Sequence, residues 1–180
     1  MKTIALYGGS FDPPHIAHEA IVKDLRELDF IDKVVVMPTF LNPFKKTFTA
    51  PAALRLQWLK EIFSEYDDVE ISSYEVDLQR KVPSIETVQH LLQSYDKIYL
   101  LIGADNLQSL SQWYKYNELK ELVTFIVATR KNIEVPNNFI QLDIDENISS
   151  SDLRKNLQAS KIPKKVRNKI VQYYKEYNAR

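Results

Sequence analysis

The sequence predicts a single α/β domain over residues 1–180, with a doubly wound, mostly parallel sheet and helices on both faces. Three observations indicate this class. Short apolar runs typical of buried strands alternate with segments of helical spacing along the whole chain. No linker, internal repeat or low-complexity segment divides the 180 residues. Each of the three glycines ends an apolar run, and parallel sheets bind ligands at the carboxyl ends of their strands.

Each predicted element follows from its apolar spacing and its flanking residues. Strands are expected where apolar residues run together, and helices where they recur on one face. Strands are expected over 3–7, 33–37, 69–72, 97–102 and 123–128, with a weaker one over 139–142. A long loop is expected over 38–50. Helices are expected after the first strand with Ala17, Ile21 and Leu25 inward, over 52–66, from a cap at Ser84, around Leu119, from Ser149, and from Pro163 with Tyr174 and Tyr177 inward.

Composition limits the class of protein. Hydrophobic residues make up 44% of the chain and charged residues 27%, which is ordinary for a globular protein. The chain has no cysteine, which excludes disulfides and thiolate chemistry. No apolar run is long enough to span a membrane, and the first predicted strand leaves no room for a signal peptide. We therefore expect a cytoplasmic protein.

The formal net charge is zero, but it is unevenly distributed. From Arg154 to Arg180 the chain has nine Lys or Arg residues and one acid, Glu176. This basic segment could bind nucleic acid, form a solvated helix face, or attract a triphosphate. We favour a combination of the last two.

The most informative stretch follows the first predicted strand and reads Gly8-Gly9-Ser10-Phe11-Asp12-Pro13-Pro14-His15-Ile16-Ala17-His18. Glycines let the backbone turn sharply and approach a ligand closely. The start of the following helix offers free N–H groups to an anion, and prolines fit its first turn. His15 and His18 are three residues apart and so share a helix face. Two imidazoles beside backbone N–H groups suit an oligophosphate.

Each part of this stretch also has an ordinary interpretation. A Gly-Gly pair is often only a turn, and two histidines could bind a metal, although no third ligand is evident nearby. The whole combination after a strand is far more specific than its parts. A Gly-x-Gly-x-x-Gly fingerprint is absent, which disfavours a dehydrogenase.

The combined stretch resembles the signature of the nucleotidyltransferase superfamily with a His-x-x-His motif, and within it the bacterial nicotinate-nucleotide adenylyltransferases. The resemblance extends from Ile4 to the last predicted helix. It implies a Rossmann-like fold. It also implies that ATP is bound by a set of residues from this stretch: Gly8, Gly9, Ser10, Phe11, His15 and His18.

A second motif extends the resemblance. Ile102-Gly103-Ala104-Asp105 ends a predicted strand and is followed by Trp113 and Tyr114. By residue type alone, Asp105 could hydrogen-bond ribose hydroxyls or simply cap a helix, and Trp113 could stack on a pyridine ring or pack in the core. The resemblance implies that Gly103 and Asp105 contact ATP, that Trp113 stacks on nicotinate, and that the backbone near Tyr114 meets its carboxylate. Asp105 and Arg130 are also expected to bind the second substrate.

A third motif, Ile148-Ser149-Ser150-Ser151 with Arg154, lies at a predicted helix start. Serine hydroxyls and free N–H groups there can hold phosphates, and Arg154 can add a charge-assisted contact. A capped helix with a solvated arginine is the alternative. The resemblance implies that Ser150, Ser151 and Arg154 hold the β and γ phosphates, so that residues 148–180 complete the ATP site.

The chain departs from the family pattern at three places. Ala17 stands where the family usually has Gly. In the loop over 38–50, Phe44 replaces the family's His and leaves Lys45 as the matching cation.

The family's Ser-Tyr-Thr segment appears as Ser84-Ile85-Glu86-Thr87. Either Glu86 or Thr87 takes the threonine position. A carboxylate facing the nicotinate carboxylate would be repulsive, so we predict that Thr87 binds the substrate.

The resemblance implies an enzyme of NAD biosynthesis that transfers AMP from ATP to nicotinate mononucleotide by direct in-line attack, releasing pyrophosphate. His15, His18, Lys45 and Arg154 would be its catalytic residues. Mg²⁺ would be bound mainly through ATP phosphates, with no metal site in the protein. Nucleic acid and membranes are not expected as partners, whereas a homodimer is plausible. The alternatives are an adenylyltransferase for nicotinamide mononucleotide or another phosphorylated acceptor, and a non-catalytic nucleotide or nucleic-acid binder.

Overall fold

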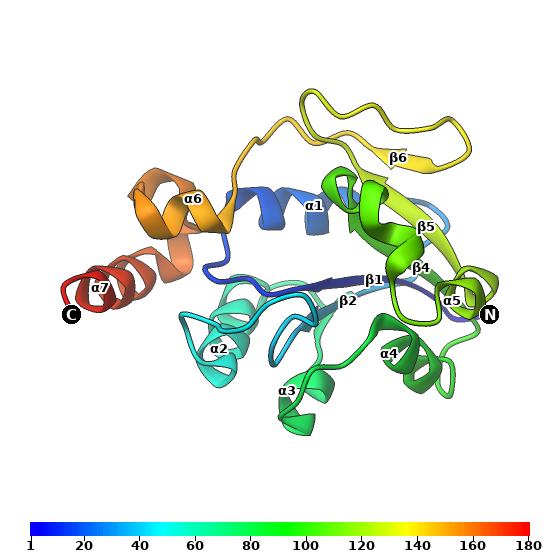
Figure 1. Ribbon diagram of the computed structural model, residues 1–180, viewed down its shortest axis with the longest axis horizontal. Helices are drawn as coiled ribbons and strands as arrows, with labels where there is room; N and C mark the ends of the chain where they lie inside the picture. The colour runs from blue at the N-terminus through cyan, green and yellow to red at the C-terminus, as the bar shows by residue number, and fades with distance from the viewer.

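Six parallel strands form the centre of the protein (Figure 1). The structure is a computed structural model that describes all residues 1–180. The strands lie in the order β3-β2-β1-β4-β5-β6, with bounds Val69–Ile71, Lys33–Pro38, Thr3–Gly9, Lys97–Gly103, Val123–Ala128 and Ile140–Leu142. The order reverses between β1 and β4, because the chain first builds outward from β1 to β3 and then returns to β4. Ligands bind at such a reversal in doubly wound sheets.

The helices cover both faces of this sheet, and Figure 1 shows α1 and α4 on opposite sides of it. The α-helices are α1 (Ile16–Arg26), α2 (Ala52–Ile62), α3 (Tyr74–Leu78), α4 (Ser84–Leu91), α5 (Tyr116–Leu122), α6 (Ser150–Lys155) and α7 (Arg167–Asn178). Three 3₁₀ segments cover Ala104–Gln112, Ala159–Lys161 and Lys164–Val166. No helix has both the length and the apolar content needed to cross a membrane.

The alternation of side chains along β1 explains why helices are needed on both faces. Ala5 and Tyr7 pack in a core of 23 buried residues that includes side chains of α1, α2 and α7. Ile4 and Leu6 pack in a second core of 16 buried residues that includes side chains of α4 and α5. A parallel strand buried on both faces reads as a continuous apolar run. The run over residues 3–7 has this form because β1 is central, paired with β2 and β4.

The predicted fold class is confirmed by the parallel sheet and its order. The expected neighbours at the reversal, the first strand and the strand over 97–102, are paired in register from Thr3 to Tyr7. The short helix α3 was not predicted. It has only five residues, too few to show a helical repeat.

Several predicted boundaries are wrong by one to four residues. Helix α2 ends at Ile62 rather than Tyr66, and Pro83 rather than Ser84 caps α4. A 3₁₀ turn follows Pro163, so α7 begins at Arg167. Tyr177 was predicted to face inward, but it is 40% exposed. Tyr174, three residues earlier, is fully buried as expected.

Helix α3 places a carboxyl group inside the protein. Glu75 is buried beneath α4 and accepts a hydrogen bond of 2.5 Å from the Thr87 hydroxyl. The pKa of Glu75 is raised to about 7, mainly by burial; the hydrogen bond from Thr87 opposes this increase, and the nearby Glu86 adds to it. Folding therefore favours the protonated form of this side chain.

We predict that Glu75→Gln stabilises the protein at alkaline pH. Because the folded-state pKa of Glu75 lies above its ordinary value of 4.5, its contribution to stability is complete below pH 4.5 and is lost as the pH rises through about 7. The neutral amide avoids this loss and should raise the free energy of unfolding by about 3 kcal/mol at pH 8 and by little at pH 4.5. Denaturant unfolding at several pH values measures the difference. The exposed Glu121→Gln is the control, and a Glu75→Gln advantage that does not vary with pH would contradict the prediction.

Candidate active site

The segment that connects β1 to α1 lies at the reversal of the strand order, and its backbone is shaped by a phenylalanine. No glycine in the protein has a positive φ, whereas Phe11 has φ 51°. The prediction that the glycines make the turn is therefore wrong. Gly9 gives space to the buried Phe11 ring, because a Cβ atom at residue 9 would lie 3.1 Å from that ring, closer than most Cβ contacts. Gly8 has no such crowding, since the nearest atom to its added Cβ would be 3.8 Å away.

His15 and His18 lie together at the start of α1. Their rings are stacked, with centroids 3.6 Å apart and planes 18° apart. His15 is the N-cap residue, and its backbone N–H donates to Nδ1 of His18 at 3.1 Å. Pro13 and Pro14 precede the cap, so the expectation that they occupy the first helical turn is wrong. The expectation that the two imidazoles share one face of the helix start is met by the stacking.

Both imidazoles are held in the neutral form. Burial, and to a smaller extent the positive charge of Arg130, together lower the pKa of His15 to about 3. Burial also lowers the pKa of His18 well below its ordinary value, with a contribution from His15. Because Nδ1 of His18 accepts a backbone N–H, the proton of the neutral ring is on Nε2. His18 thus presents a neutral N–H donor from a fixed ring.

Two aromatic rings hold His18 in place. The Phe11 ring meets the His18 ring edge-on at a centroid distance of 4.8 Å, and the Tyr7 ring lies 6.1 Å away. Tyr7 and Phe11 also contact each other edge-on at 5.2 Å. This cluster buries the imidazole against the end of β1, which is the cause of its low pKa.

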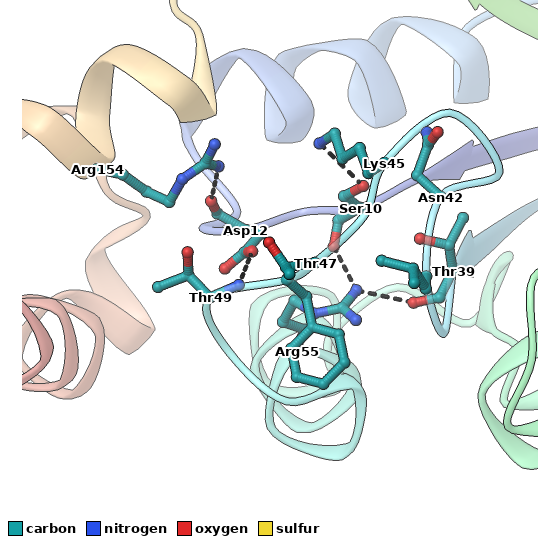
Figure 2. Close-up of a pocket in the computed structure, with 11 residues that line it drawn as sticks. Ser10, Asp12, Thr39, Asn42, Lys45, Thr47, Thr49, Arg55 and Arg154 are labelled. Carbon is teal, nitrogen blue, oxygen red and sulfur yellow. Dashed lines mark hydrogen bonds between the residues drawn. The ribbon is translucent and has the colours of Figure 1, made fainter.

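Two cations reach the same segment from distant parts of the chain. Nζ of Lys45 donates to the Ser10 hydroxyl at 3.3 Å, and Nη1 of Arg154 donates to the Asp12 carbonyl at 2.6 Å. Figure 2 shows these side chains approaching the segment from opposite sides. Partial burial lowers the pKa of Lys45, and Arg154 lowers it further, while Asp12 opposes both effects. The arrangement favours binding of an anion beside Lys45 and Arg154.

A polar cavity of about 80 Å³ opens between this segment and the loop over 38–50 (Figure 2). Its walls are mostly hydroxyl, amide and cationic groups: Ser10, Asp12, Thr39, Leu41, Asn42, Lys45, Thr47, Phe48, Thr49, Arg55 and Arg154. The buried Thr39 hydroxyl has no hydrogen-bond partner. Nor does Nδ1 of His15.

The Asp12 carboxylate joins three segments of the protein. Its Oδ2 accepts the Thr49 N–H at 2.7 Å, and its Oδ1 accepts the Ala50 N–H at 2.9 Å. The Tyr174 hydroxyl on α7 also donates to Oδ1. Asp12 is only 3% exposed, so these donors replace the water it would otherwise bind. Its oxygens are engaged in structure and are poorly placed to bind a metal.

Helix α6 brings the predicted phosphate-binding serines to the β1–α1 segment. Ser149 caps the helix by accepting the Asp152 N–H at 3.1 Å. The Ser150 hydroxyl donates to the Pro13 carbonyl at 2.9 Å, so Ser150 lies against the first motif. Ser151 is exposed. The structure thus places Ser150 and Arg154 against the segment that carries the histidines.

Asp105 and Arg130 follow the neighbouring strands β4 and β5 and form an ion pair, with Nη1 of Arg130 3.3 Å from Oδ2 of Asp105. Gly103 gives Asp105 the space for its conformation, since an added Cβ would lie 2.6 Å from Oδ1 of Asp105. Asp105 also acts electrostatically on Tyr7, and Arg130 on His15, so this pair belongs to the same edge of the sheet. Both residues are partly exposed and can meet a ligand.

The residues predicted to bind the pyridine differ in how far the structure exposes them to a ligand. Trp113 packs on the second core, with its indole Nε1 buried and without a partner. Tyr114 is 64% exposed. Thr87 is 2% exposed and its hydroxyl is bound to Glu75, so the structure does not present it to a ligand. Glu86 pairs with Arg80 at the surface, which offsets its charge.

Sequence reasoning missed Arg55, which lines the cavity and is 1% exposed. It lies on α2, three residues before Trp58 and four before Leu59, both buried. An arginine on the apolar face of a helix is the signal that could have identified it. The hydrogen bond from Tyr174 to Asp12 was also missed, because Tyr174 was interpreted only as core.

No group of three or more His, Cys, Asp or Glu side chains is placed to hold a metal ion. Apart from Asp12, which is bound by three protein donors, and Asp105, which is paired with Arg130, the candidate site consists of neutral imidazoles, hydroxyls and cations, a donor set that suits phosphates.

The fold and the site together define a nucleotidyltransferase. The sequence model of the cytidylyltransferase-like family matches residues 6–156, which include the His15–His18 segment and Arg154. A nicotinic acid mononucleotide adenylyltransferase of Plasmodium falciparum, solved in complex with NaAD, has the same fold with a TM-score of 0.76. It is 21% identical, and the match covers 99% of this chain and 97% of that one.

More similar sequences identify the branch of this class. A relative from Sulfurimonas denitrificans, named "Probable nicotinate-nucleotide adenylyltransferase", is 61% identical over 176 residues, covering 98% of this chain and 97% of the relative. One of the same name from Campylobacter fetus is 48% identical over 179 residues, covering 98% and 99%. The chain belongs to the nicotinate-nucleotide adenylyltransferase family.

We predict that His15 makes the protein less stable at mildly acidic pH. Its folded-state pKa of about 3 lies below the ordinary value of 6.5, so between these values only the unfolded chain takes up the proton. Its contribution to stability is complete above pH 6.5 and is lost as the pH falls. Between pH 7 and pH 5, the free energy of unfolding of His15→Asn should therefore fall by about 2 kcal/mol less than that of the wild type.

Urea unfolding at these two pH values measures this effect. The matched control is His90→Asn, at the exposed histidine of α4, which should follow the wild type. Parallel stability curves for His15→Asn and the wild type would show that His15 is not buried in its neutral form.

Proposed function

We propose that this protein transfers AMP from ATP to nicotinate mononucleotide, giving nicotinate adenine dinucleotide and pyrophosphate. Family membership supports the reaction. The observation that carries it at the level of the site is the convergence of four residues on the segment over 10–18. Lys45 and Arg154 hydrogen-bond this segment, and His15 and His18 stack within it.

The proposed chemistry is a direct in-line displacement at phosphorus. A phosphate oxygen of nicotinate mononucleotide attacks the α-phosphorus of ATP, a new P–O bond forms, and the bond to the bridging oxygen of pyrophosphate breaks. The attacking phosphate oxygen is already ionised near neutral pH, so no protein nucleophile and no covalent intermediate are required. The protein contributes position and charge stabilisation.

The proposed roles of the four residues follow from their protonation and reach. His18 donates its Nε2–H to a phosphate oxygen as a neutral group, and His15 stacks behind it. Lys45 and Arg154, bound to Ser10 and Asp12 of the same segment, carry positive charge and stabilise the leaving pyrophosphate. An anion arriving between them raises the histidine pKa values, because it favours the charged imidazole.

The remaining predicted residues are assigned to the two substrates by their position. Ser150, Ser151 and the ends of β1 and β4 at Gly8, Gly9 and Gly103 are proposed to surround ATP, together with Ser10, Phe11 and Asp105. The second substrate is proposed to lie toward Trp113, the backbone of Tyr114, and Arg130. Thr87 would reach it only if its hydrogen bond to Glu75 broke. Residues 148–180 complete the site through Arg154 and through the bond from Tyr174 to Asp12.

Mg²⁺ is proposed to accompany ATP on its phosphate oxygens. The side chains around the site fit this arrangement, because most are cations, hydroxyls and imidazoles, while the Asp12 carboxylate is already bound by three donors and Asp105 is paired with Arg130. The ion would supply charge neutralisation on the triphosphate, and the protein would hold it through the nucleotide.

The proposed function predicts strong preference for the acid form of the acceptor. Pyrophosphate release is measured with ATP and Mg²⁺ and either nicotinate mononucleotide or nicotinamide mononucleotide. We expect turnover with the acid to exceed turnover with the amide at least about 10-fold, since recognition of a charged group is worth more than about 1.4 kcal/mol. Preference for the amide would reassign the acceptor, and no release with either would reject the function.

We predict that His18→Ala lowers kcat at least about 100-fold while the protein stays folded, because one preorganised donor to the reacting phosphate is lost. The control is His90→Ala, which changes the third histidine of the chain, stacked on Tyr74 at the surface. Circular dichroism checks folding, and initial rates of pyrophosphate release measure kcat. An active His18→Ala enzyme would exclude the imidazole from the chemistry.

A further inference from the structure

Arg55 is a buried cation whose hydrogen bonds all go to backbone carbonyls. Nε donates to the Ala50 carbonyl at 2.8 Å, Nη1 to those of Ser10 and Thr39 at 2.6 and 2.9 Å, and Nη2 to that of Phe40 at 2.9 Å. An arginine has five N–H donors in a rigid planar fork, so four of the five are used. The side chain is 1% exposed, and no direct ion pair to a carboxylate is formed.

The four carbonyls belong to two segments of the site. Ser10 lies in the β1–α1 segment, at the residue whose hydroxyl is bound by Lys45. Thr39 and Phe40 begin the loop over 38–50, and Ala50 ends it. Arg55 therefore joins both ends of the loop to the segment that carries the histidines.

The middle of this loop has few other attachments. Phe44 is 67% exposed, and Lys45 is exposed. Within the loop, the Lys45 N–H donates to the Asn42 carbonyl at 2.9 Å, and the Phe44 N–H to the Asn42 side chain at 2.9 Å. Outside it, Lys81 reaches the Pro43 carbonyl at 3.4 Å. The position of Lys45 relative to Ser10 thus depends on how the two loop ends are held.

We propose that Arg55 is a positioning residue for AMP transfer, which acts by fixing both ends of the 38–50 loop so that Lys45 is held over Ser10. This inference rests on the proposed function. Arg55 does not touch the substrate in this role. Its guanidinium sets the separation between loop and segment, and Lys45 meets the phosphates.

Lysine cannot replace arginine in this role. An ammonium group has three N–H donors on a flexible stem, so at least one of the four carbonyls loses its partner in Arg55→Lys. The charge is kept, which separates geometry from electrostatics. A displacement of about 1 Å at a positioning contact costs on the order of 10²-fold in rate.

The test is a double-mutant cycle between Arg55 and Lys45, measured as pyrophosphate release with nicotinate mononucleotide. We expect Arg55→Lys to lower kcat about 100-fold in the wild-type background, with the KM for nicotinate mononucleotide little changed. In the Lys45→Ala background we expect the same substitution to lower kcat by no more than about threefold, because the residue through which it acts is already absent. The control is Arg26→Lys, at a half-buried arginine paired with Asp68 at 2.7 Å and distant from the loop, which should keep wild-type kcat.

The outcomes separate this inference from the proposed function. No turnover by the wild type would reject the function itself. Wild-type turnover with losses that multiply in the double variant would overturn only the role of Arg55. Thermal unfolding is followed for each variant and for Arg55→Gln. If neither Arg55→Lys nor Arg55→Gln folds, Arg55 serves the core and the proposal is overturned.

Discussion

The site depends on the burial of one carboxylate. Asp12 is almost free of solvent, so its charge must be met by protein donors, and these come from residues 49 and 50 and from Tyr174. Arg55 lies close enough for the two opposite charges to interact, although its hydrogen bonds go to carbonyls. Two buried charges with complementary backbone partners thus define the path of the β1–α1 segment and of the loop beside it. The histidines and Lys45 take their places from that path.

The electrostatics of the site follow from the same burial. The stacked imidazoles are neutral because the end of β1, Phe11 and Tyr7 exclude water from them. Apart from the buried Arg55, the positive charge is supplied by Lys45 and Arg154 at the rim, where solvent still reaches them. The imidazoles carry no charge, and the one buried cation, Arg55, is met by four carbonyls and lies near Asp12, so the resting site needs no bound anion to offset buried positive charge.

The sheet could be predicted from the sequence, because strands buried on both faces leave continuous apolar runs. The first motif could be predicted because its Gly-Gly and His-x-x-His residues are close together in the sequence. The residue that makes the turn after β1 could not be predicted, because nothing in the sequence shows that Phe11, and not a glycine, takes the positive φ. Thr87 was assigned to the substrate from a motif, and its burial against Glu75 depends on α3, a helix too short to leave a pattern. The position of Arg55 on the apolar face of α2 could be predicted from its spacing to Trp58 and Leu59, but its four carbonyl partners could not, because they come from the β1–α1 segment and the loop.

The contacts to Asp12 also affect when the site can exist during synthesis. Arg154 and Tyr174 are 142 and 162 residues from the residue that they bind. Contacts of such sequence separation form late, since closing a long loop has a large entropic cost before any contact offsets it. On the ribosome, the β1–α1 segment emerges first and must wait for α7 before its buried carboxylate is satisfied. The set of contacts to Asp12 is therefore complete only after α7 has packed against the β1–α1 segment.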